Sequence, residues 1–239
     1  MSDAAEATPS GAAIHYEILS AIVNRGYAPG VEELAATFDC AREFDCARET
    51  VEAGLRSLAD DHGVVLHPGS ARIWVAHPFS LAPTGFLVRQ ADRSWWGNCA
   101  WCSLGIAALL GGAVTITTTL GLEDRQVTIH VADDGVAEHD LLVHFPVPMS
   151  NAWDNVLYTC STMLVFDGDA AVADWCRRHG VAKGDVRPIE QVWRFASEWY
   201  GRHLDRDWRK WTADEARAMF ARHGLDGPIW EMPAAESRF

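Results

Sequence analysis

At residues 95–112 the chain reads WWGNCAWCSLGIAALLGG. Two tryptophans precede the thiols Cys99 and Cys102, and the residues from there to the glycine pair at 111 and 112 are apolar almost all round. A segment that is apolar on every side is typical of a buried helix, and glycines commonly end helices. The sequence therefore predicts a helix over 101–110 in the interior of the fold, with Cys102 near its beginning.

The segments that follow this helix predict an α+β fold with a mixed or antiparallel sheet flanked by helices. Strands are predicted over 114–120, 127–131 and 141–145, and through Cys160 over 155–166. Helices are predicted over 170–179, from 189 onward through a Trp-rich stretch, and over 212–223. The last of these has Thr212 at its cap and Glu215 three residues later, which is the pattern of a capping box.

The first 80 residues predict a winged-helix-like unit. Apolar residues at helical spacing predict helices over 14–24, 31–38 and 50–59, followed by strands over 64–66 and 73–75. Such a unit often binds DNA, but residues 1–80 carry twelve acidic side chains against five arginines and no lysine. Because positive charge supplies most of the affinity for DNA, we expect a packing or lid domain instead.

We expect four segments along the chain. These are a disordered tail (1–13), a winged-helix-like N-terminal domain (14–80), a thiol-site domain (81–188) and a Trp-rich helical extension (189–239).

The chain has 239 residues and a formal charge of −13, which argues against nucleic acid and anionic membrane surfaces as partners. Its first residues lack the basic and apolar regions of a secretory signal, and no apolar run approaches the roughly 18 residues of a membrane span. We therefore expect a cytoplasmic protein, whose six cysteines are free, metal-binding or catalytic rather than disulfide-bonded. Nothing in the sequence indicates the oligomeric state.

A tandem repeat lies in the N-terminal region, where FDCARE occurs at 38–43 and again at 44–49. Six residues of a helix rotate by about 240°, so two copies in one helix cannot face the same partner. We interpret the repeat as a local duplication and expect Cys40 and Cys46 to be bystanders.

The remaining thiols are the candidates for chemistry. Cys99 and Cys102 have CxxC spacing, and Cys160 follows 58 residues after Cys102 in the segment YTCST. A buried cysteine is commonly a small hydrophobic residue, and a lone CxxC is a weak metal signal. Tryptophans and a tyrosine crowd both segments, however, and a dry thiol pair suits a soft cation such as Hg(II) or Cu(I). We treat Cys176 and the scattered histidines His130, His139 and His144 as incidental.

The segments AWCSLG (100–105) and YTCS (158–161) resemble the two catalytic segments of bacterial organomercurial (alkylmercury) lyases. The resemblance extends over about residues 14–205. It implies protonolysis, in which two thiolates take up the mercury of R–Hg⁺ and an aspartate three residues after the first cysteine delivers a proton to carbon. R–H then leaves, Hg(II) stays on the thiolates, and no further cofactor is required. Carried over by position, the thiols are Cys102 and Cys160.

One position departs from the family pattern. Gly105 stands where the resemblance implies the aspartate, and glycine has no proton to give. Cys99 is the nearest surrogate, as a third ligand or a proton donor, although it fits a filler role equally well; Ser103 and Asp154 are further candidates. The residues expected around the thiols are Trp95, Trp96, Trp101, Ser103, Gly105, Tyr158 and Ser161.

Four functions remain open from the sequence. The first is a lyase that acts on a small organomercurial, and the second is a soft-metal-binding protein of the same fold without catalysis. The third is cysteine-based chemistry on an organic substrate, for which Gly105 would enlarge the pocket beside Cys102. The fourth, a DNA-binding metal sensor, is disfavoured by the acidic charge.

Overall fold

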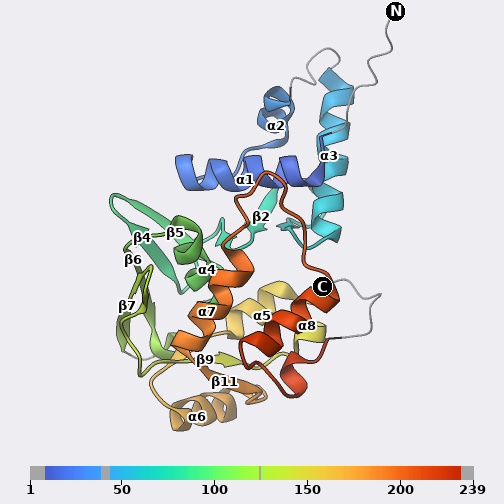
Figure 1. Ribbon diagram of the computed structural model, residues 1–239. Coiled ribbons are helices and arrows are strands. Elements are labelled where there is room, and N and C mark those ends of the chain that lie inside the picture. The colour runs from blue at the N-terminus through green and yellow to red at the C-terminus, as the bar shows by residue number, and fades with distance from the viewer. Residues whose placement is uncertain (1–8, 39–43, 124, 233–239) are drawn as a thin grey trace, which may run out of the picture.

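The computed structural model describes residues 9–38, 44–123 and 125–232, and it combines antiparallel sheets with helices packed against them (Figure 1). The expected α+β class is confirmed. Residues 39–43 of the tandem repeat, including Cys40, lie outside the described residues, as does the side chain of Cys46.

Three helices form the N-terminal part of the molecule: α1 (Gly11–Arg25), α2 (Val31–Thr37) and α3 (Phe44–Asp60). The first begins three residues earlier than predicted, because the Ser10 hydroxyl caps it by accepting a hydrogen bond from the Ala13 amide at 3.2 Å. Gly54 lets α1 and α3 approach closely, since a Cβ at this position would lie 2.4 Å from Ile14 Cδ1. The winged-helix interpretation stays a prediction.

The larger sheet has eight strands in the order β1-β2-β3-β5-β4-β6-β7-β8. They are β1 (Val64–Leu66), β2 (Ile73–Ala76), β3 (Phe79–Ser80), β4 (Leu87–Gln90), β5 (Arg93–Gly97), β6 (Val114–Thr119), β7 (Gln126–Ala132) and β8 (Gly135–Val136). Each neighbouring pair is antiparallel. Burial alternates along the predicted strand β6, with Val114 and Ile116 buried and Thr115 and Thr117 partly exposed.

A second sheet pairs β9 (Leu142–Phe145) with β10 (Val165–Phe166) and β11 (Asp185–Pro188). The predicted strand over 155–166 is wrong for most of its length, because residues Val156–Thr162 form the helix α5. The Asn155 side chain starts this helix by accepting a hydrogen bond from the Tyr158 amide at 3.0 Å, a capping signal that outweighs the threonines inside it. The predicted helix at 170–179 is present as α6 (Asp169–His179).

The central helix α4 (Ala100–Leu110) is buried, as its all-round apolar sequence predicts. It lies between the larger sheet and α7 (Ile189–Tyr200), and α7 packs along it (Figure 1). Trp101 of α4 stacks on Phe195 of α7 with ring centroids 4.8 Å apart. The predicted division of the chain into four segments stays a prediction.

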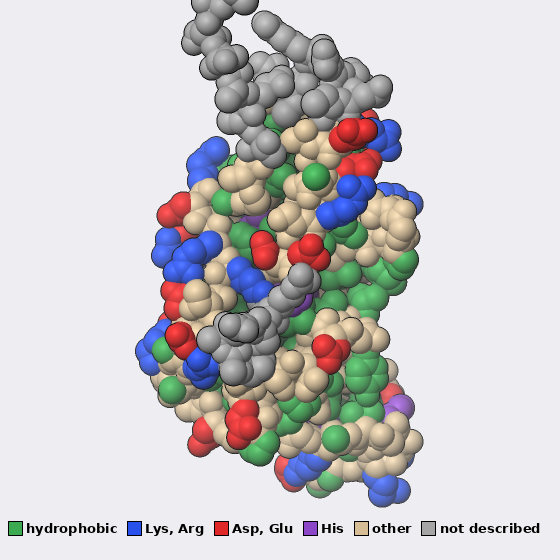
Figure 2. Space-filling view, turned by 90° about the vertical axis from the view of Figure 1, so that its right-hand side faces the viewer, with side chains coloured by type: hydrophobic (Ala, Val, Ile, Leu, Met, Phe, Trp, Pro, Cys, Tyr) green, Lys and Arg blue, Asp and Glu red, His purple; other side chains and the backbone are tan. Residues whose placement is uncertain are grey.

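The C-terminal part adds the helix α8 (Ala213–Arg222). Elsewhere along the chain, short 3₁₀ helices lie at Leu120–Leu122, Met149–Asn151 and Pro228–Trp230. On the face drawn in Figure 2, Lys and Arg side chains lie among Asp and Glu side chains. The described residues form ion pairs such as Arg209–Glu215. No helix within the described ranges is long and apolar enough to cross a bilayer.

We expect Thr212→Ala to lower the free energy of unfolding by about 1 kcal/mol, the usual cost of losing an N-cap. The Thr212 hydroxyl accepts a hydrogen bond from the Glu215 amide at 3.2 Å, and the Glu215 carboxylate accepts one from the Thr212 amide at 2.9 Å. For a chain of this size the change lowers Tm by about 2–4 °C, measurable by thermal denaturation. A variant that melts at the wild-type temperature would show that the capping box contributes nothing.

Candidate thiol centre

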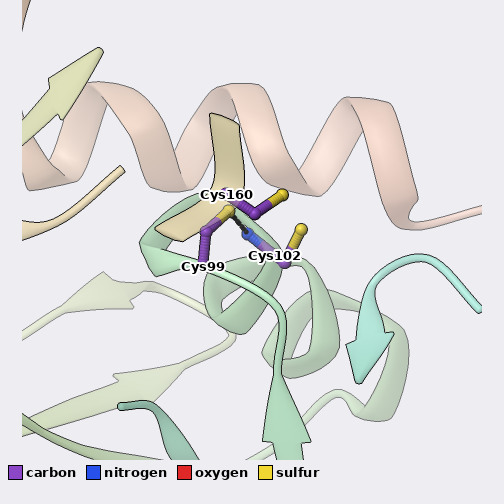
Figure 3. A group of neighbouring side chains, drawn as sticks. All are labelled: Cys99, Cys102 and Cys160. Carbon is purple, nitrogen blue, oxygen red and sulfur yellow. Dashed lines mark hydrogen bonds between the residues drawn. The ribbon is translucent and has the colours of Figure 1, made fainter. Parts of the chain in front are cut away.

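Three buried thiols from two separate segments meet beside α4. Cys99 and Cys102 come from the beginning of α4 and Cys160 from α5, and their sulfur atoms all lie within 4.8 Å of one another (Figure 3). A hydrogen bond of 3.1 Å from the Ala100 amide to the Met163 carbonyl ties the two segments together. The side chains of the three cysteines are 0–5% exposed, so the cluster is shielded from bulk water.

Cys99 has a defined structural position at the N-cap of α4. Its backbone is extended, and its sulfur accepts a hydrogen bond from the Cys102 amide at 3.3 Å, the dashed line in Figure 3. Its sulfur also lies 3.8 Å from Met163 Sδ. Cys99 is the N-cap residue, so it does not lie on the same helical face as Cys102. Its sulfur comes close to Cys102 because it caps the first turn of α4.

Cys102 has two further neighbours that the sequence analysis missed. His77 Nδ1 lies 3.8 Å from its sulfur and the hydroxyl of Tyr200 lies 3.5 Å from it. His77 follows β2 and Tyr200 ends α7, 25 and 98 residues away along the chain. Neither residue has a spacing that points to the thiols, so only the tertiary structure reveals them.

These contacts favour a thiolate at Cys102. Burial opposes its ionisation, but hydrogen bonds with Cys160, Cys99 and His77 outweigh burial and hold the pKa of Cys102 well below its usual range. Burial raises the pKa of Cys99, and the hydrogen bond with Cys102 raises the pKa of Cys160. Burial and the negative charge of Cys102 raise the pKa of Tyr200. The cluster therefore combines one sulfur prepared for nucleophilic attack with neighbours that keep their protons.

Gly105 packs against Tyr200. A Cβ at Gly105 would lie 2.2 Å from Tyr200 Cδ2 and within 2.8 Å of two more ring atoms. The expectation that Gly105 enlarges the pocket beside Cys102 is wrong, because the tyrosine ring fills the space that the missing side chain leaves.

Of the remaining residues expected at the pocket, Trp101 lines the thiol cavity and the others do not. Trp101 lines the cavity beside Cys102 and Cys160, whereas the indole of Trp95 points to α1 and donates to the Ile22 carbonyl at 2.9 Å. Ser103 donates to the Cys99 carbonyl at 2.7 Å. Three others lie away from the cavity: Trp96 lines a cleft against the N-terminal helices, Tyr158 is 48% exposed and Ser161 is exposed.

The incidental residues also have local partners. His130 pairs with Glu138 and His139 with Glu190 on the surface, while the His144 ring lies 2.7 Å from the Lys183 carbonyl. Cys176 Sγ lies 3.5 Å from His144 Nε2, and Cys176 is not a member of the thiol cluster.

A cavity of about 20 Å³ adjoins Cys102 and Cys160. Its walls include Trp101, Trp153 and Tyr200, with His77 at one side. A second cavity, of about 30 Å³, shares the side chains of His77, Trp153 and Tyr200 and extends to Asp61 and Lys210. Trp153 therefore stands between the thiol cavity and this outer space. A larger hollow, of about 940 Å³, lies elsewhere, beside the N-terminal helices.

Residues 79–201 match the family model of MerB, the alkylmercury lyases. The match spans more than half of the chain and includes both thiol segments. The chain therefore belongs to the alkylmercury lyase family, as the motifs around Cys102 and Cys160 indicate.

A solved structure has the same fold. The crystal structure of the mercury-bound form of MerB2 superposes with a TM-score of 0.65 at 18% sequence identity, covering 82% of this chain and 91% of that one. Among the curated proteins, none matches the sequence.

Proposed function

We propose that this protein cleaves the carbon–mercury bond of small organomercurials by protonolysis, with Cys102 and Cys160 as the two thiols. The observation that carries the proposal is the convergence of three buried sulfurs within 4.8 Å of one another. Two of them, those of Cys102 and Cys160, line a cavity with aromatic walls. Thiolates are the preferred ligands of soft cations, and exclusion of water strengthens the polar interactions inside the site.

In the proposed reaction the Cys102 thiolate binds the mercury of R–Hg⁺ first, because its pKa is the lowered one. Cys160 then binds the same mercury and gives up its proton. Two sulfur ligands weaken the carbon–mercury bond, whose electron pair forms the new carbon–hydrogen bond as a proton reaches carbon. The products are R–H and Hg(II) held by two thiolates, and no oxidation state changes.

The test is turnover of methylmercury by the full-length protein with an excess of small thiol present. Release of methane together with one Hg(II) for each methane supports the proposal. Tight binding of methylmercury with no hydrocarbon released would refute it.

A soft-metal-binding function without catalysis is the second candidate, and one observation favours it. Among the described residues that line the cavity beside Cys102 and Cys160 there is no carboxylate, whereas Cys99 supplies a third sulfur beside the other two. Three thiolates can hold Hg(II), or Cu(I), as a stable complex. Stoichiometric metal binding by a protein that releases no hydrocarbon would select this function.

We expect Trp153→Ala to raise the rate with phenylmercury relative to methylmercury by about tenfold or more. A cavity of about 20 Å³ has room for a methyl-sized group, whereas a benzene ring needs on the order of 150 Å³. Trp153 stacks on His62 with centroids 4.5 Å apart, and its removal joins the thiol cavity to the outer one. The measurement is the ratio of kcat/KM for the two substrates.

Trp74→Ala is the matched control, because Trp74 stacks on His67 in the same way, at 4.8 Å, away from the thiols. An unchanged ratio in Trp153→Ala, or an equal change in Trp74→Ala, would contradict the role of Trp153 as the wall that limits substrate size.

A further inference from the structure

The proposed reaction needs a proton donor at the carbon that leaves mercury. The donors considered from the sequence are poorly placed or engaged elsewhere. The Ser103 hydroxyl is bound to the Cys99 carbonyl, and the exposed Asp154 accepts a hydrogen bond from Asn151 at 2.9 Å. The Cys99 thiol donates towards Met163 Sδ at 3.8 Å, and its sulfur accepts a hydrogen bond from the Cys102 amide at 3.3 Å.

Tyr200 has the geometry that these residues lack. Its hydroxyl lies 3.5 Å from Cys102 Sγ, its side chain is 3% exposed and it lines the cavity that holds both proposed mercury ligands. A phenol carries its proton at neutral pH and can both donate and accept a hydrogen bond. A methyl group on mercury bound to Cys102 would therefore lie beside a hydroxyl that carries a proton.

The packing around Tyr200 fixes this position. Its ring rests on Gly105, lies 5.3 Å from Trp101 and 5.0 Å from His203 between centroids, and belongs to the last turn of α7. Any side chain at position 105 would push the ring away, so the glycine and the tyrosine form a complementary pair. The pairing explains why this site accommodates a glycine beside its first thiol.

We propose that the Tyr200 hydroxyl delivers the proton to carbon in the carbon–mercury cleavage, an inference that rests on the proposed function. The carbon–mercury electron pair takes the proton of the hydroxyl to form R–H. The phenolate recovers a proton from the one that Cys160 releases on binding mercury, so protons balance over the turnover. His77 is the rival donor, because its Nδ1 also lies close to the Cys102 sulfur, at 3.8 Å.

The test compares wild type with Tyr200→Phe in single turnovers of methylmercury, with protein in excess. Removal of one oxygen keeps the ring against Gly105 and deletes the donor. We expect methane release to slow by at least about 100-fold, the usual lower range for loss of a general acid. We expect Tm and the stoichiometry of Hg(II) binding to stay at wild-type values. Uncleaved methylmercury should remain on the protein, visible as added mass in intact-protein mass spectrometry.

Tyr16→Phe is the matched control. Tyr16 lies on α1, away from the thiols, and its hydroxyl lies 3.4 Å from an Arg206 nitrogen. The Tyr16→Phe protein should cleave methylmercury at the wild-type rate. Methane release by Tyr200→Phe within about threefold of wild type would overturn the inference and leave the proposed function standing. Loss of Hg(II) binding together with loss of cleavage would also overturn the inference. Tyr200 would then be needed for metal binding and not for proton transfer. A wild type that releases no methane overturns the proposed function, and this inference with it.

Discussion

Cys102→Ala and Cys160→Ala are each expected to abolish methane release from methylmercury, with a loss of about 10³-fold or more in rate. Either change leaves mercury on one sulfur of the pair, so the bidentate ligation that weakens the carbon–mercury bond is lost. A metal–ligand interaction that stabilises the transition state by several kcal/mol corresponds to a loss of this size. The measurement is hydrocarbon released per protein, with mercury bound per protein recorded in parallel.

Cys176→Ala is the control for these two variants. Its thiol is also buried, but its neighbour is His144 and it lies outside the cluster. It should cleave at the wild-type rate. Full activity in either Cys102→Ala or Cys160→Ala would show that the two thiols do not act together.

Gly105→Asp is expected to destabilise the protein by about 3 kcal/mol or more and to give no gain in cleavage. The new Cβ would overlap the Tyr200 ring, and the carboxylate would be buried without a partner. For a chain of this length the loss lowers Tm by roughly 6–12 °C. Thermal denaturation and methylmercury turnover measure the two effects.

Two variants separate the steric cause from other effects of an added carboxylate. Gly168→Asp places the same side chain where a Cβ meets open space, and it should leave Tm nearly unchanged. Gly105→Asp combined with Tyr200→Ala removes the ring and should recover part of the lost stability. A Gly105→Asp protein with wild-type stability and higher turnover would contradict the packing described for this pair.

The sequence predicts the features that depend on local pattern. The buried helix α4 follows from its apolar residues, and the cap of α8 follows from Thr212 and Glu215. Residues 156–162 form a helix despite their threonines because Asn155 caps them, a choice that local strand propensity does not reveal. In these elements the physical cause lies within a few residues of the effect.

The candidate site is predictable only in part, for a related reason. Cys102 and Cys160 stand out because short motifs surround them, and the structure brings them together. His77 and Tyr200 reach Cys102 through the packing of β2 and α7, and no sequence pattern links residues that lie 25 or 98 positions from Cys102. The role of Gly105 in making room for the Tyr200 ring likewise follows only from the tertiary structure, in which the two residues are in contact.

The enclosure of the sulfurs has a consequence for what happens after bond cleavage. Thiols that are at most 5% exposed, beside a cavity of about 20 Å³, give a tripeptide such as glutathione no path to the bound ion. An exchange reaction requires an incoming thiolate to touch the metal before an outgoing one departs. Under the proposed reaction the aromatic wall therefore has to shift each time Hg(II) is transferred to an incoming thiol, and the same wall shields the sulfurs from bulky oxidants.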